Sequence, residues 1–183
     1  MLRAGLIGFS GSGKSALFQL LTSTRDARRT TKSEANVGVA RVPDVRLDRL
    51  TELFNPRKRV PATVEFADIA GTTAGRSGAQ ALLDVAAFRN ADALLHVVRM
   101  FRDPSVPHPA GSIDPARDVR TMEDELILAD LGIVERRLER LEKDLKKSNT
   151  PELRKEHDSL TLCHATLEEG RPLRTLTPSA EEQ

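Results

Sequence analysis

The chain has 183 residues, 39% of them hydrophobic and 30% charged, and its 28 basic and 27 acidic residues leave a net charge of +1. This balance gives no overall field that favours nucleic acid or acidic membranes, and the lack of Trp and Tyr in the sequence argues against base stacking on aromatic side chains. A single cysteine, Cys163, excludes an internal disulfide framework, and no apolar run approaches the roughly 20 residues that span a bilayer, so we expect a cytoplasmic protein without a membrane partner.

The first predicted element is a short buried strand that leads into a glycine-rich turn and a helix. Residues Leu2 to Ile7 are mostly apolar and end at a glycine, which predicts a strand inside a sheet. Residues Lys14 to Ser23 carry leucines on one face at helical spacing, which predicts an amphipathic helix. The polar segment 25–36 shows neither period and is predicted to be a loop.

Strands and helices continue to alternate along the next part of the chain. We predict strands over 37–42, 62–68 and 93–98, and helices over 43–54 and 79–89. This alternation is typical of an α/β fold with a mainly parallel sheet. Ligands of such sheets bind at the carboxyl ends of the strands, so we expect the glycine turn and Asp68 to lie at the same edge.

The character of the chain changes after Phe101. We predict a first domain over 1–102 and a proline-rich linker over 103–120. Over 121–170 the apolar residues recur in steps of three and four and then of seven, which predicts an antiparallel helical coiled-coil hairpin. We expect a structural arm, although the pattern leaves a partner-binding surface open. The tail over 171–183 is polar.

The glycine-rich turn is a complete phosphate-binding loop, Gly8-Phe9-Ser10-Gly11-Ser12-Gly13-Lys14-Ser15. Its glycines let backbone N–H groups converge on phosphate oxygens, and the helix that follows adds its positive end. Lys14 supplies a mobile positive charge between the β- and γ-phosphates, and the Ser15 hydroxyl can ligate Mg²⁺. The residues predicted to hold a nucleoside triphosphate here are Gly8, Ser10, Gly11, Ser12, Gly13, Lys14, Ser15 and Ala16.

A second motif, Asp68-Ile69-Ala70-Gly71, ends the strand predicted over 62–68. In phosphate-binding domains such a carboxylate holds Mg²⁺, and the glycine N–H senses the γ-phosphate. Alone, the pattern is more typical of an aspartate in a turn. Because it follows a phosphate-binding loop on a separate strand, we interpret Asp68 as a Mg²⁺ ligand and Gly71 as a phosphate contact.

These motifs are part of a longer series of phrases that follow one another in a fixed order. The segments are Gly8–Phe18, Asn36–Val39, Val42–Asp48, Val64–Gly71, His96–Phe101, Asp114-Pro115 with Asp118, and Glu125–Leu131. In this order and over nearly the whole chain, the sequence resembles the YchF group of Obg-related nucleotide hydrolases. The resemblance implies a P-loop NTPase with a Ras-like G domain and a helical coiled-coil arm inserted after the fourth strand. It also implies hydrolysis of GTP or, in the YchF group, preferably ATP, and a link to ribosomes.

The departures from the family pattern concern residues near the phosphates. Ala16 stands where members normally carry Thr after the loop serine. The threonine expected to close over Mg²⁺ falls by spacing on Lys32. The adjacent Thr30 and Thr31 could take its place after a small register shift, with a solvated loop threonine as the equal alternative for both. Thr72 follows Gly71, where Ras-like enzymes have a water-orienting Gln and this family has a hydrophobic residue.

Hydrolysis would need a polar group that positions water, and His108 sits where the family carries a histidine after the fourth strand. A lone loop histidine is more often simply solvated. The catalytic candidates are Lys14, Thr72 and His108, and the candidate Mg²⁺ ligands are Ser15, Asp68 and Thr31.

The family's base-reading motif, an N-K-x-D or N-x-x-E-like pattern after a fifth strand, is missing, because the chain stops at Gln183. The resemblance implies that residues 171–183 return toward the G domain and that the chain is a fragment or a truncated relative. The fourth strand would then be an exposed apolar edge that invites self-association. Two functions stay open: Mg²⁺-dependent binding and hydrolysis of ATP or GTP as a translation-associated switch, or a truncated module that binds nucleotide or a partner without hydrolysis.

Overall fold

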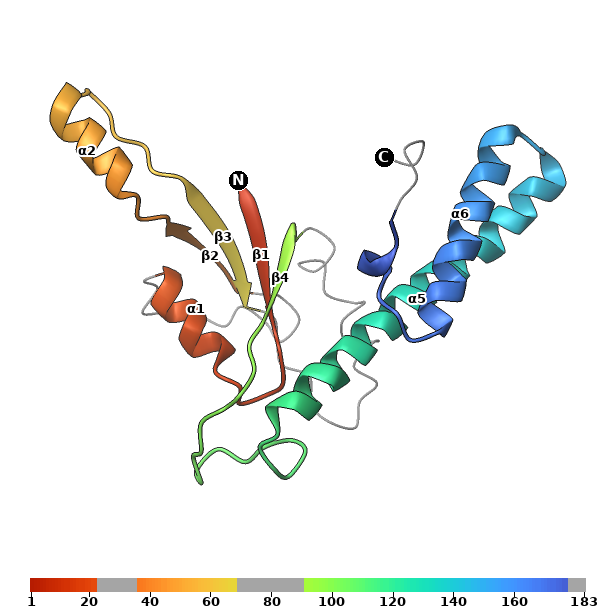
Figure 1. Ribbon diagram of the computed structural model, residues 1–183, viewed down its shortest axis with the longest axis horizontal. Coiled ribbons are helices and arrows are strands. Elements are labelled where there is room, and N and C mark those ends of the chain that lie inside the picture. Colours follow the sequence, from red (N-terminus) through yellow and green to blue (C-terminus); the bar gives the residue numbers. More distant parts are fainter. Residues whose placement is uncertain (23–35, 69–90, 178–183) are drawn as a thin grey trace. The chain divides into compact units, whose positions relative to one another are not determined.

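The structure is a computed structural model that describes residues 1–22, 36–68 and 91–177. The chain divides into two compact units, with the boundary between Pro115 and Ala116. The first unit contains a sheet with two helices, and the second contains a helical hairpin (Figure 1).

The described part of the first unit forms a four-stranded sheet in the order β2-β3-β1-β4. The central strand β1 (Leu2–Ile7) pairs in parallel with β3 (Thr63–Asp68) on one side and with β4 (Ala93–His96) on the other. Strand β2 (Asn36–Arg41) pairs with β3 antiparallel. The four predicted strands are confirmed with small shifts at their ends, and the sheet is mixed, since only β2 departs from the parallel arrangement.

Helix α1 (Lys14–Thr22) follows β1 and packs on the sheet through Phe18, which is buried. The contact is close on the strand side, because a Cβ built at Gly38 of β2 would stand 2.9 Å from Phe18 Cζ and 2.6 Å from Thr22 Cγ2. Within β1, Ala4, Leu6 and Ile7 are buried as well. The apolar core therefore fixes both the strand that precedes the glycine-rich loop and the helix that follows it.

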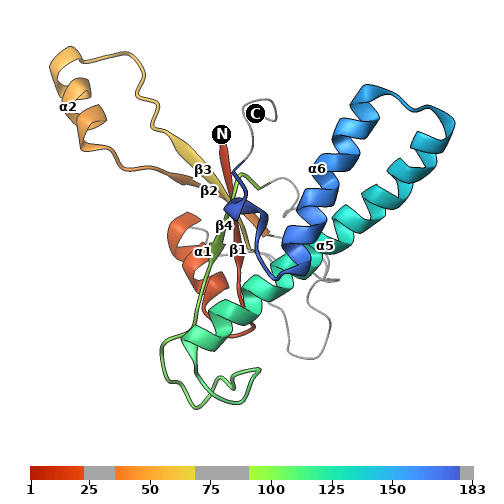
Figure 2. The same cartoon turned by 45° about the vertical axis from the view of Figure 1, so that its right-hand side comes forward.

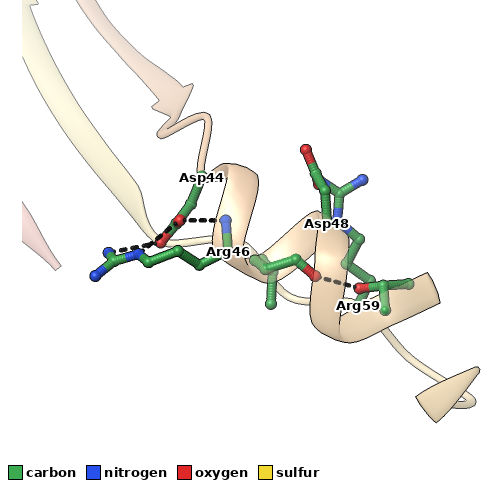
Figure 3. Close-up of polar contacts among 6 residues, drawn as sticks. Asp44, Arg46, Asp48 and Arg59 are labelled. Carbon is green, nitrogen blue, oxygen red and sulfur yellow. Dashed lines mark hydrogen bonds and ion pairs between the residues drawn. The ribbon is translucent and has the colours of Figure 1, made fainter. Parts of the chain in front are cut away.

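Helix α2 (Val45–Phe54) extends from the ends of β2 and β3, and each of its residues keeps part of its surface exposed (Figure 1). Asp44 caps its first turn, because its carboxylate accepts a hydrogen bond from Arg46 N at 2.9 Å and also pairs with the Arg46 guanidinium. An ion pair between Arg59 and Asp48 joins the helix to the segment that follows it (Figure 3). Local polar contacts therefore define this helix.

The second unit is a hairpin of helices α5 (Pro115–Lys147) and α6 (Pro151–Glu168), which run side by side (Figures 1 and 2). Its buried core contains Ile127 and Val134 from α5 and Leu167 from α6. Partly buried residues packed against this core are Leu131, Leu138, Leu160, Cys163 and Leu173. The apolar period predicted over 121–170 thus corresponds to the packed faces of the two helices.

Helix α5 begins earlier than the sequence predicts, since Pro115 lies inside the segment 103–120 expected to be a linker. Proline is favoured in the first helical turn, where its missing N–H has no partner to lose, and Asp118 places an acidic side chain near the positive helix end. A short 3-10 turn, Leu173–Thr175, lies in the polar tail.

The helix predicted over 79–89 lies outside the described residues. In the described part of the chain, no helix has both the length and the apolar character needed to cross a membrane.

Candidate functional site

The glycine-rich loop joins the carboxyl end of β1 to the first turn of α1. Three of its residues have positive φ angles, 144° at Gly8, 75° at Gly11 and 100° at Gly13, which residues with side chains rarely adopt. At Gly8 there is also no space, because a Cβ would stand 2.4 Å from Val97 O of the neighbouring segment. The glycines therefore specify a tight backbone path, as a loop that approaches phosphate groups closely requires.

Lys14 is buried in the first turn of α1, with 6% of its surface exposed. Its Nζ donates hydrogen bonds to Gly8 O at 3.0 Å and to Phe9 O at 2.9 Å, so the side chain folds back over the loop. Burial lowers the pKa of Lys14, whereas the negative charge of Asp68 acts in the opposite direction. The loop thus surrounds a desolvated ammonium group, and an anion bound there would stabilise its charge.

Asp68 is the last residue of β3 and is nearly buried. The parallel register of β1 and β3 places it beside Leu6, at the strand end that leads into the glycine-rich loop. This is the common edge that the alternation of strands and helices predicts for Asp68 and the loop. The site therefore combines a buried ammonium with a carboxylate on the neighbouring strand.

The serines of the loop differ in their surroundings. Ser15 and Ala16 are exposed at the start of α1, and Ser10 is exposed in the loop before it. Ser12 is buried, and its Oγ has no hydrogen-bond partner among the described residues. The role of the Ser15 hydroxyl as a Mg²⁺ ligand stays a prediction.

His108 follows β4 in the sequence and lies beside the loop, with its ring centroid 6.4 Å from that of Phe9. Its Nδ1 accepts a hydrogen bond from Ala110 N at 3.2 Å, which leaves Nε2 to carry the proton of a neutral imidazole. The structure thus brings one candidate from a distant loop to the phosphate-binding loop. Thr31, Gly71 and Thr72, the other predicted site residues away from the loop, lie outside the described residues.

Sequence reasoning did not single out Arg99, which follows β4 and is only 2% exposed. Its Nε donates to Phe101 O at 3.2 Å and its Nη2 to Asp103 O at 3.1 Å, and the guanidinium lies 4.7 Å from the centre of the Phe101 ring. A charged residue after an apolar strand usually marks the point where a chain reaches solvent. The one signal in the sequence is its position, directly after a strand that ends near the loop.

Residues 3–137 match a family model described as a 50S ribosome-binding GTPase. The chain belongs to this family. It is 38% identical to the ribosome-binding ATPase YchF of Bacillus subtilis, in an alignment that covers 100% of this chain and 51% of the relative. It is 34% identical to Obg-like ATPase 1 of Oryza sativa subsp. indica, over 94% of this chain and 45% of that relative. The solved structure of the Schizosaccharomyces pombe YchF GTPase is 29% identical and superposes with a TM-score of 0.74, covering 99% of this chain and 51% of that one.

These similarities confirm both the P-loop GTPase fold and the resemblance to YchF and Obg-like proteins. As a member of the ribosome-binding GTPase family, the chain spans about half the length of the curated relatives that it matches.

Proposed function

We propose that the chain binds ATP or GTP together with Mg²⁺ and hydrolyses it as a switch associated with translation. The observation that carries the proposal is the glycine-rich loop, in which three glycines have positive φ angles and two carbonyl groups accept hydrogen bonds from the buried Lys14. The names of the relatives support it, since they include ribosome-binding ATPases and a YchF GTPase. Because both nucleotides occur in these names, the choice between ATP and GTP stays part of the test.

In the proposed reaction the protein acts by position and charge. Backbone N–H groups of the loop and the Lys14 ammonium neutralise the phosphate oxygens, which is the main contribution of proteins to phosphoryl transfer. We propose Thr31 and Gly71, which lie outside the described residues, as further contacts of Mg²⁺ and the γ-phosphate that are lost after hydrolysis. Thr72 and His108 are the candidates for positioning the attacking water, and His108 is the one with a described location beside the loop.

Mg²⁺ suits the oxygen donors of this site. The exposed Ser15 hydroxyl and the Asp68 carboxylate at the end of β3 are hard ligands, and we propose Thr31 as a further one. Within residues 1–22, 36–68 and 91–177, no cluster of three or more His, Cys, Asp or Glu is suited to a metal on its own. We propose that phosphate oxygens and water complete the coordination of the Mg²⁺ ion. When bound, the ion would neutralise charge on the phosphates.

Two partners follow from the same proposal. The first is the ribosome, which appears in the names of the family model and of the bacterial relatives. The second is another copy of the chain, because β4 lies at one edge of the described sheet and exposes 39% of Leu94 and 42% of Leu95. An apolar edge strand is a template for pairing with a further strand.

The direct test is Mg²⁺-dependent phosphate release from ATP and from GTP by the 183-residue chain. We expect Lys14→Ala to reduce turnover by about 100-fold or more, since it removes the cation that the loop surrounds. Lys143→Ala, which alters an exposed lysine of the hairpin, is the matched control and should leave turnover unchanged. Equal turnover in Lys14→Ala and the wild type would contradict the proposal.

A non-hydrolysing nucleotide-binding module is the second candidate function, favoured by Thr72 in the position where Ras-like enzymes have Gln. Calorimetry decides between the two. Triphosphate binding without phosphate release over several hours would assign the chain to this second class.

A further inference from the structure

Arg99 is a buried cation whose hydrogen bonds hold its own downstream segment. Its Nε and Nη2 donate to the carbonyl oxygens of Phe101 and Asp103, at 3.2 Å and 3.1 Å. Its third nitrogen, Nη1, is buried and has no hydrogen-bond partner among the described residues. Burial of a guanidinium costs free energy unless its N–H groups donate hydrogen bonds, so the burial of Arg99 calls for a structural explanation.

The segment that Arg99 holds is a compact turn. The Asp103 carboxylate accepts hydrogen bonds from Ser105 N at 2.9 Å and from Ser105 Oγ at 2.6 Å. Val106 N donates to Asp103 O at 3.2 Å, the same carbonyl that accepts from Arg99 Nη2. Arg99 and the turn over 103–106 are therefore joined at one oxygen atom.

This turn lies against the phosphate-binding loop at Gly11. A Cβ built at Gly11 would stand 2.9 Å from Val106 Cγ1, 3.5 Å from Arg99 Nη1 and 3.8 Å from Pro107 O. Gly11 itself has a φ of 75°, a conformation that glycine adopts readily and that a residue with a side chain would disfavour. The next residue after Pro107 is His108, whose ring lies beside Phe9 of the same loop. The segment that Arg99 holds by hydrogen bonds therefore lies next to the phosphate-binding loop at Gly11.

We propose that Arg99 is a positioning residue of the phosphate-binding loop: it braces the turn over 103–107 against Gly11 and keeps the loop in its phosphate-accepting shape. It does so through packing and carbonyl hydrogen bonds, without contact to the reacting atoms. The consequence for nucleotide binding rests on the proposed function, whereas the consequence for the loop's order does not. Replacing the guanidinium removes the side-chain donor to the Phe101 carbonyl and one of the two donors to the Asp103 carbonyl, and so loosens the turn.

The first experiment compares the wild type with Arg99→Met and Arg99→Lys in the 183-residue chain. Calorimetric titration with Mg²⁺ and ATP, and with Mg²⁺ and GTP, is expected to show a dissociation constant about tenfold higher for Arg99→Met. Arg99→Lys should recover part of this loss, because the ammonium keeps the contact with the Phe101 ring but cannot serve two carbonyls in a fixed fork. Arg102→Met, which removes an exposed arginine of the same segment, is the matched control.

Amide hydrogen exchange of Gly11, Ser12 and Gly13 gives a readout that needs no nucleotide. We expect these amides to exchange faster in Arg99→Met than in the wild type, with the hairpin amides unchanged. Unchanged exchange at the loop would overturn the inference, even if the affinity fell. If the wild type bound no nucleotide, the proposed function would fail while the exchange experiment still tested the brace.

A second pair of variants applies if Arg99→Met does not fold. Gly11→Ala introduces a methyl group against Val106 Cγ1, and it should weaken triphosphate binding through both this clash and the unfavourable φ. Adding Val106→Ala removes the clash but not the strain, so the double variant should regain at least about threefold in affinity. A double variant that is no better than Gly11→Ala would show that the turn does not rest on the loop, and would overturn the inference.

Discussion

In the phosphate-binding loop, the buried side chains are polar, since Ser12 and Lys14 are each 6% exposed. The neighbouring Arg99, whose Nη1 lies near Gly11, is 2% exposed. In the helical hairpin, the buried side chains are mostly apolar, and the cluster at its centre contains Ile127, Val134 and Leu167. The loop keeps its shape through glycine conformations and individual hydrogen bonds. The hairpin keeps its shape through many apolar contacts of the same kind, repeated along two helices.

This difference predicts how each region responds to change. In the loop each position supplies a particular backbone conformation or hydrogen bond, so one substitution removes an interaction that neighbouring residues cannot replace. In the hairpin the free energy is spread over many contacts, so one truncation weakens the packing by a share that depends on the cavity left behind. The same type of substitution, made once in the loop and once in the hairpin, can therefore separate effects on triphosphate affinity from effects on the free energy of unfolding.

The largest effect is expected for Gly8→Ala. The added Cβ would lie 2.4 Å from Val97 O and would require a φ of 144°, so the loop must adopt another path and triphosphate binding should be lost. The same substitution at Gly132 in α5 meets nothing within 4 Å and should stabilise the helix by about 0.5–1 kcal/mol. Calorimetry and thermal unfolding of both variants test the contrast, and full affinity in Gly8→Ala would break it.

The converse experiment is Leu167→Ala in the hairpin core. Leu167 is 2% exposed, so its truncation should lower the free energy of unfolding of this unit by about 2–5 kcal/mol and leave triphosphate affinity unchanged. Leu162→Ala, at a position of the same helix that is 54% exposed, serves as the control and should have a much smaller effect. Urea unfolding followed by circular dichroism measures both. A parallel loss of nucleotide affinity in Leu167→Ala would mean that the two regions are not independent.

The smallest effect concerns a polar contact that is exposed instead of buried. Hydrogen bonds from Arg46 lower the pKa of Asp44 from 3.8 to about 2, because they favour the charged carboxylate that caps α2. A depressed folded-state pKa means that the contribution is complete above pH 3.8 and is lost as the pH falls toward 2. We expect the first amides of α2 to exchange faster across this window, whereas Asp44→Asn, which still caps a helix, should remove the pH dependence. An NMR titration of the Asp44 carboxyl with a midpoint near 3.8 would contradict this assignment.

Much of the fold could be predicted from the sequence because local patterns and tertiary packing agree. The strand before Gly8, the strand that ends at Asp68 and the apolar period of the hairpin each follow from residue order alone. The start of α5 could not, because Pro115 is compatible both with a linker and with a first helical turn. Arg99 was missed for a different reason: its Nη1 lies near Gly11, which is far from it in the sequence, and no local pattern records that proximity. The same holds for the placement of His108 beside Phe9.

The close contact between Gly38 and α1 has a consequence for the evolution of this domain. Every nonsynonymous change of a glycine codon adds at least a Cβ, and at position 38 that atom would meet Thr22 and Phe18 at less than 3 Å. A larger residue at position 38 therefore requires the Thr22 and Phe18 side chains to shift or to be replaced by smaller ones. The residues acceptable at position 38 depend on those at positions 18 and 22, so changes at these three sites are coupled.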